Sequence, residues 1–175
     1  MKHSVKDLII AALCLAIGIV LPFVTGQVPA IGNMLLPMHI PVFVCAFTSS
    51  KTLSVLVGLV LPLFRSVLFS RPVFFPNAVA MAVELATYAL VASCLYACFK
   101  RRNIAAVYGS MIPAMLLGRI AWGLFSWLIF GLSSASFTLS YFFAEAFLYA
   151  IPGVVLQLIV VPVLVMLIRD DHHFG

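Results

Sequence analysis

Long apolar runs separated by short polar stretches form the pattern of this chain. Six runs stand out, at about 5–24, 38–50, 52–69, 76–99, 105–131 and 140–168. All but one meet or approach the roughly 20 apolar residues that an α-helix needs to cross a bilayer. The run at 38–50 is too short to cross upright, and Pro37 and Pro41 at its start suit the first turn of a helix. The pattern predicts an all-α, polytopic membrane protein with six transmembrane helices.

Composition excludes a soluble domain. The 175 residues are 65% hydrophobic and only 9% charged, which leaves too few polar side chains to cover a water-exposed surface. The basic N-terminus resembles that of a signal peptide, but the apolar run from Leu8 to Val24 is too long for one and no small-x-small cleavage site precedes Gln27. We therefore expect a retained first helix and a single transmembrane domain over 1–175.

The positions of the basic residues predict the orientation. If the N-terminus is cytoplasmic, the outer connections hold only Arg71 among the lysines and arginines. The inner side then holds Lys2, Lys6, Lys51, Lys100, Arg101, Arg102 and Arg169. By the positive-inside rule, both termini lie in the cytoplasm and the chain is a multi-pass protein of the plasma membrane. The net charge of +5 is thus mostly a topology signal and no nucleic-acid partner is indicated.

Four charged residues fall within the predicted spans: Arg65, Glu84, Arg119 and Glu145. Each costs about 2.5–3.5 kcal/mol at a helix centre, so such residues face the protein interior, pair, or line a polar cavity. In the predicted topology all four lie at the midplane or in the outer half of the membrane. They therefore mark either a functional site or a set of ion pairs that lock the helices together.

Further polar and aromatic residues gather on the same side. They are Gln27, Asn33 and His39 around the proline-rich loop after the first run, Asn77 in the fourth, Trp122 and Trp127 in the fifth, and Tyr141 in the sixth. Polar groups converging beneath one loop are typical of a small-molecule site, with the loop as its lid or wall. For Asn33, His39 and Asn77, capping of nearby helix ends is an equal alternative.

Several catalytic motifs are absent from the sequence. It has no GxxxxGK[ST] phosphate loop, no HExxH and no GxSxG, and Cys14, Cys45, Cys94 and Cys98 follow no metal-ligand spacing. We expect no enzyme, no metal and no cofactor in this chain. A small intramembrane enzyme using Glu84 or Glu145 is the alternative from another class, and a scaffold subunit without a ligand is a further one.

The first run carries a ridge of small residues. Ala12 and Ala16, four residues apart in AALCLAIG, let another helix approach closely. The run has no charged residue beyond Asp7, which suits a protein–protein face.

Five segments resemble the substrate-binding S components of energy-coupling factor (ECF) vitamin importers: LCLAIGIVLPF, IGNMLLPMHIPVF, VGLVLPLFRSVLF, PNAVAMAVELATY and IPGVVLQLIVVPVLV. The resemblance implies capture of a vitamin or precursor from outside. It also implies docking, through the Ala12 and Ala16 ridge, on a transmembrane coupling protein that carries two cytoplasmic ATPases. ATP is then used by these partners.

The two arginines within the predicted spans indicate the charge of the ligand. Arg65 and Arg119 favour an anion, because a guanidinium pairs well with a carboxylate or phosphate. Pantothenate fits, and a pyridoxine-like or pyrimidine ligand stacked on Trp122 or Tyr88 is the alternative. The predicted ligand-binding residues are Asn33, His39, Arg65, Asn77, Glu84, Tyr88, Arg119, Trp122 and Glu145.

Overall fold

The computed structural model describes residues 4–24, 36–131 and 150–170. The described residues form helices joined by short connections and include no strand. Its elements are α1 (Val5–Val24), α3 (His39–Thr48), α4 (Lys51–Phe69), the irregular turn η1 (Phe74–Ala78), α5 (Val79–Cys98), α6 (Ile104–Gly131) and α8 (Ile151–Asp170).

Each of the six predicted runs overlaps a described helix, which confirms an all-α membrane protein. Five of the helices in the described ranges are long and apolar enough to cross a membrane, and α3, with ten residues, is shorter. The total of six spans and the orientation of the termini stay predictions.

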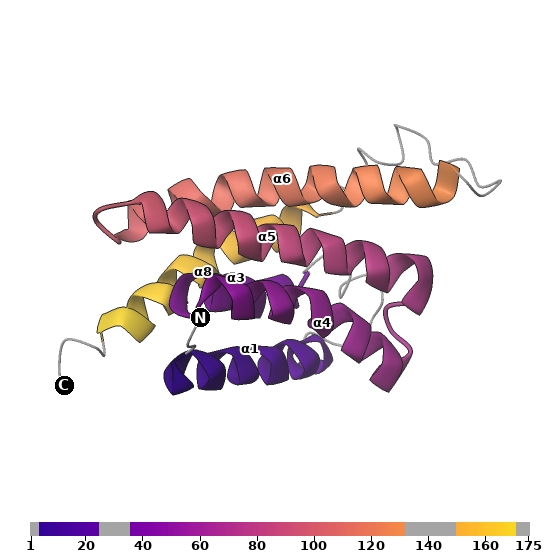
Figure 1. Cartoon of the computed structure of the whole chain (residues 1–175), viewed down its shortest axis with the longest axis horizontal. Coiled ribbons are helices and arrows are strands. Elements are labelled where there is room, and N and C mark those ends of the chain that lie inside the picture. The colour runs from indigo at the N-terminus through magenta and orange to yellow at the C-terminus, as the bar shows by residue number, and fades with distance from the viewer. Residues whose placement is uncertain (1–3, 25–35, 132–149, 171–175) are drawn as a thin grey trace.

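The short helix α3 occupies the centre of the bundle (Figure 1). It contacts α1, α4, α5 and α8, and all of its residues except Thr48 are buried. A helix enclosed in this way contacts protein on every side and need not match the thickness of the bilayer. The structure thus explains why a run too short to cross upright is nevertheless strongly apolar.

Glycines allow α5 to approach both of its long neighbours. α5 packs along α4 on one side and α6 on the other (Figure 1). A Cβ at Gly58 of α4 would lie 2.7 Å from the backbone oxygen of Leu85, and a Cβ at Gly118 of α6 would overlap the ring of Tyr88. Both glycines lie against the middle of α5. They therefore determine how closely α4 and α6 can pack against α5.

The outer faces of the long helices are apolar. Leu13 and Ile17 of α1, Leu124 of α6 and Ile159 of α8 are each more than half exposed. An exposed apolar surface of this extent marks contact with another apolar phase or partner. Because the network of polar groups lies inside the bundle, the apolar outer surface is suited to contact with lipid.

Candidate ligand-binding site

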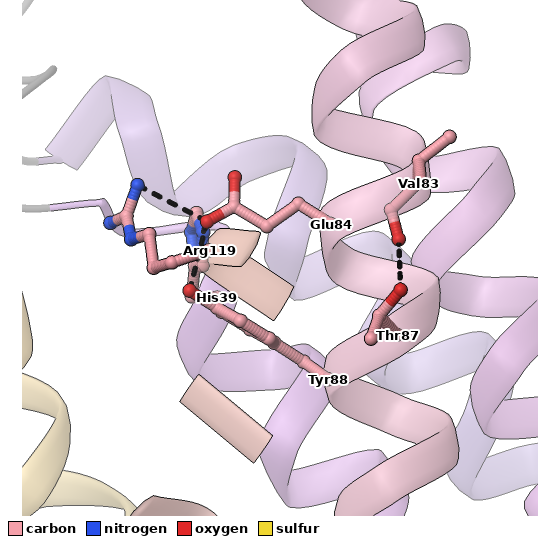
Figure 2. A network of polar contacts seen from close by, with 6 residues as sticks. All are labelled: His39, Val83, Glu84, Thr87, Tyr88 and Arg119. Atoms are coloured by element: carbon pink, nitrogen blue, oxygen red, sulfur yellow. Dashed lines mark hydrogen bonds and ion pairs between the residues drawn. The ribbon is translucent and has the colours of Figure 1, made fainter. Parts of the chain in front are cut away.

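The carboxylate of Glu84 is the centre of a buried polar network (Figure 2). The Tyr88 hydroxyl donates a hydrogen bond of 2.8 Å to its Oε1, and Nη1 of Arg119 lies 3.1 Å from the same oxygen. Nε2 of His39 lies 3.7 Å from it. Glu84 and Tyr88 share one face of α5 because they are four residues apart. His39 comes from α3 and Arg119 from α6, so the network joins three helices.

All four network residues are buried. The exposed fractions are 1% for His39, 2% for Glu84 and Tyr88, and 8% for Arg119. An ionised group at such a place is costly unless an opposite charge and hydrogen bonds compensate for the lost water. The Arg119–Glu84 pair supplies that compensation. One of the ion pairs expected from the sequence therefore exists, and it ties α5 to α6.

Aromatic rings support the network from the side of α3. The Tyr88 ring stacks on Phe43 with centroids 5.1 Å apart and lies 5.3 Å from the imidazole of His39. Nδ1 of His39 is buried and has no hydrogen-bond partner among the described residues. Buried polar atoms are rarely left unsatisfied, so this nitrogen is suited to a bound molecule. No side-chain hydrogen bond caps the start of α3. The structure therefore does not show the helix-capping alternative considered for His39.

Arg65 lies apart from the carboxylates. Its guanidinium is 5.4 Å from the centre of the Phe23 ring, and Nη1 lies 3.9 Å from the sulfur of Met38. Within the described ranges no carboxylate comes within ion-pair distance of it. Since Met38 directly precedes His39, the half-buried Arg65 is a positive charge beside the first turn of α3, close to the network.

The other predicted residues are spread more widely. Trp122 is half-buried on α6, about one turn beyond Arg119 and on the same side of the helix. Asn77 is exposed in η1, outside the buried network. Asn33 and Glu145 lie outside the described residues. The structure thus brings together His39, Glu84, Tyr88 and Arg119, with Arg65 and Trp122 near by in the fold.

Gln157 is a polar residue that the sequence reasoning missed. It is 1% exposed in α8, and neither atom of its amide group has a hydrogen-bond partner in the part of the chain that the structure describes. The signal was available, because Gln157 is the single polar side chain in the run from Ile151 to Ile168.

The comparisons with known proteins agree with this architecture. The family model described as the substrate-specific component of ECF transporters matches residues 6–167, nearly the whole chain. No curated protein and no solved structure matches the chain. A match of this extent includes every described helix that bears a network residue. The chain belongs to the family of substrate-specific components of ECF transporters.

Proposed function

We propose that this chain binds a water-soluble vitamin or vitamin precursor from outside the cell for ATP-driven uptake with an ECF module. A substrate-binding role in transport follows from the family. The observation that carries the proposal further is the buried network around Glu84, in which charged and polar groups from three helices meet inside an otherwise apolar bundle. Intramembrane ionisable groups of this kind are functional by default.

Pantothenate is the proposed ligand. Arg119 already contacts Glu84, whereas Arg65 has no described carboxylate nearby, so Arg65 is the better partner for the ligand's carboxylate. Nδ1 of His39 is available for a hydroxyl or amide of the same molecule. Glu84 and Tyr88 then hold His39 and Arg119 in place. A guanidinium prefers a carboxylate because two parallel N–H donors match its two oxygens.

A pyridoxine-like or pyrimidine ligand is the second candidate. Such a ring needs an aromatic face to stack on. The Tyr88 ring is 2% exposed and already stacks on Phe43, so Trp122, which is half-buried beside Arg119, is the better platform. The observation that favours pantothenate over this candidate is the Arg65 guanidinium without a described carboxylate.

The chain is proposed to act without a cofactor and without catalysis of its own. The family is that of substrate-specific components of transporters, which supports a binding role. ATP hydrolysis belongs to two partner ATPases attached to a coupling protein. Glu84→Gln separates the alternatives: a binding protein changes in affinity, whereas an enzyme using Glu84 as acid or base loses turnover while still binding its substrate.

A thermal-shift screen of the purified protein in detergent tests the proposal. Water-soluble vitamins and their precursors are added one at a time. A ligand at 1,000 times its dissociation constant adds about 4 kcal/mol to stability, which gives a visible shift. We expect pantothenate to stabilise the wild-type protein and the Arg71→Ala control, whose residue is exposed between α4 and η1. We expect a much smaller effect on Arg65→Ala.

Two other outcomes of the thermal-shift screen would change the proposal. Stabilisation by a pyridoxine-like or pyrimidine compound, lost in Trp122→Ala, would replace pantothenate by the second candidate. No shift from any compound, with the protein folded, would contradict ligand binding and favour the scaffold alternative.

A further inference from the structure

The side-chain amide of Gln157 is almost completely buried and yet unpaired. Gln157 is 1% exposed, and neither Nε2 nor Oε1 has a hydrogen-bond partner among the described residues. Two buried hydroxyls of the same bundle are satisfied. Ser54 on α4 donates to the carbonyl oxygen of Cys45, and Ser110 on α6 donates to that of Ala106. Because buried polar atoms are rarely left without partners, the amide of Gln157 requires an explanation.

Gln157 lies on the side of α8 that faces the bundle. Val161, four residues further on, is completely buried in the apolar core. Ile159, on the other side of the helix, is 61% exposed. α8 contacts α3 and α6, the helices that carry His39 and Arg119 (Figure 1). The amide of Gln157 is therefore directed toward the helices of the polar network.

A small pocket near the C-terminal ends of α3, α5 and α8 gives these helices a common reference. Thr48 of α3, Tyr96 of α5 and Ile168 of α8 all line it. At a rise of about 1.5 Å per residue, His39 lies about 14 Å from this pocket along α3 and Glu84 about 18 Å along α5. Gln157 lies about 17 Å from it along α8. Side chains of all three helices lean away from the pocket, toward their N-termini. Gln157 is thus at the height of the network.

The chemistry of the amide indicates a neutral partner. A glutamine side chain offers N–H donors on one atom and an acceptor on the other. A carboxylate accepts from Nε2 but leaves Oε1 unpaired, whereas a hydroxyl or an amide both donates and accepts. Nδ1 of His39, on the helix next to α8, is also buried without a described partner. Two neighbouring helices thus present unpaired polar atoms at one height, as expected where a molecule binds between them.

We propose that Gln157 is a ligand-contacting residue that selects a hydroxyl or amide group of the vitamin. The inference rests on the proposed function and extends it, because Arg65 then recognises the charge of the ligand and Gln157 its neutral part. Arg65 lies on α4 and Gln157 on α8, and both helices contact α3. The ligand reaches across the first turn of α3, past His39. A site built to pair a hydroxyl or amide rejects an analogue that lacks it.

Calorimetric titration with pantothenate tests the inference. Gln157→Met keeps the length of the side chain and removes both hydrogen-bonding atoms, so we expect binding about tenfold weaker or more. Ser110→Ala is the matched control, because it removes a buried polar group that is already satisfied within α6. It should bind like the wild-type protein. Thermal unfolding without ligand reports folding, and Gln157→Met should be at least as stable as the wild-type protein.

Analogues of pantothenate separate direct contact from an indirect effect. Each analogue lacks one hydroxyl or carries an ester oxygen in place of the amide N–H. The analogue without the group that Gln157 contacts should bind the wild-type protein about tenfold more weakly than pantothenate. It should bind Gln157→Met as well as pantothenate does, because the missing groups are partners. A purely structural role of Gln157 lowers the affinity for pantothenate and for every analogue by the same factor.

Two results would overturn this inference alone. They are unchanged pantothenate affinity in Gln157→Met, and an equal loss for pantothenate and all analogues. Failure of the folded wild-type protein to bind pantothenate would contradict the proposed ligand and the inference together, and it is seen before any variant is made. If Gln157→Met does not fold, Gln157→Leu gives the same comparison.

Discussion

One oxygen atom of Glu84, Oε1, contacts side chains from three helices: His39 of α3, Tyr88 of α5 and Arg119 of α6. Such a residue is coupled to its neighbours, so the effect of replacing it depends on what remains around it. Removing one partner of a buried ion pair is far more costly than replacing both, because the remaining charge loses its compensation.

We predict that Glu84→Ala lowers the free energy of unfolding by about 3 kcal/mol. The combined Glu84→Ala/Arg119→Ala variant should lose less than the sum of the two single losses, with a coupling of about 1 kcal/mol or more. Unfolding in detergent, followed by circular dichroism for all four proteins of the cycle, measures this. Strictly additive losses would mean that the pair contributes little.

Gln157 allows a prediction of the opposite sign. Its buried amide has no described hydrogen-bond partner, so the folded state bears the cost of removing it from water. Gln157→Met, which keeps the length of the side chain, should raise the stability of the ligand-free protein by about 1 kcal/mol. The apparent Tm without added ligand gives the answer. A lower Tm would show that the amide is hydrogen-bonded to water or to residues beyond those described.

At the scale of elements, the packing of α6 on α5 determines the geometry of the network. Arg119 reaches Glu84 because Gly118, the preceding residue, leaves room for the Tyr88 ring. A methyl group at 118 must displace either this ring or the helix. Overpacking of this kind costs about 1–3 kcal/mol.

We predict that Gly118→Ala weakens ligand binding at least tenfold, because it moves Tyr88 and with it the donor to Glu84. Gly109→Ala is the control on the same helix, since a Cβ there meets only the tip of the exposed Phe99 ring, at 3.0 Å. Ligand titration by thermal shift or calorimetry compares the two. Equal affinities would mean that the Tyr88 position is unimportant for binding.

The small-residue ridge on α1 remains available for a partner helix. Ala12 and Ala16 are both exposed, and they lie on a helix whose outer face is otherwise bulky and apolar. We predict that Ala12→Leu or Ala16→Leu abolishes uptake with the ECF module and leaves ligand binding intact, because the added bulk prevents close helix approach. Ala105→Leu adds the same bulk at an exposed position of α6 and should transport normally. Loss of binding in both α1 variants would indicate a folding defect and contradict the docking role.

At the scale of the whole molecule, the chain is a multi-pass protein of the plasma membrane. Its two ends differ in chemistry. The connection after α4 holds Arg71, whereas Lys100, Arg101 and Arg102 follow α5 at the other end of the same bundle. By the positive-inside rule we expect this second end to lie in the cytoplasm.

We predict that a membrane-impermeant maleimide labels Arg71→Cys in intact cells and labels Arg101→Cys only after permeabilisation. Both substitutions are made in a background where the four native cysteines are replaced by serine or alanine. The reverse pattern would invert the topology. It would also put the Glu84 network on the side of the membrane from which an importer releases its substrate.

The sequence predicted most of the fold and singled out the residues that form the buried network. The helical runs agree closely with α1, α4, α5 and α6, because the length of an apolar run is a property of consecutive residues. His39, Glu84, Tyr88 and Arg119 were all among the predicted ligand-binding residues, since a polar group within an apolar run is conspicuous. Asn77 was predicted by the same reasoning but lies exposed outside the network.

By itself, the sequence determined that the chain is a helical membrane protein, that charged residues lie inside its spans, and that one end of it is basic. Only the tertiary structure decided that Arg119 and not Arg65 contacts Glu84, that α3 is enclosed at the centre, and that Lys6 and Arg102 line one pocket. The reason is physical. The cost of placing a charge in the membrane depends on the residue and its depth. Its compensation depends on which side chains of other helices come within a few ångströms, and helix packing sets these distances.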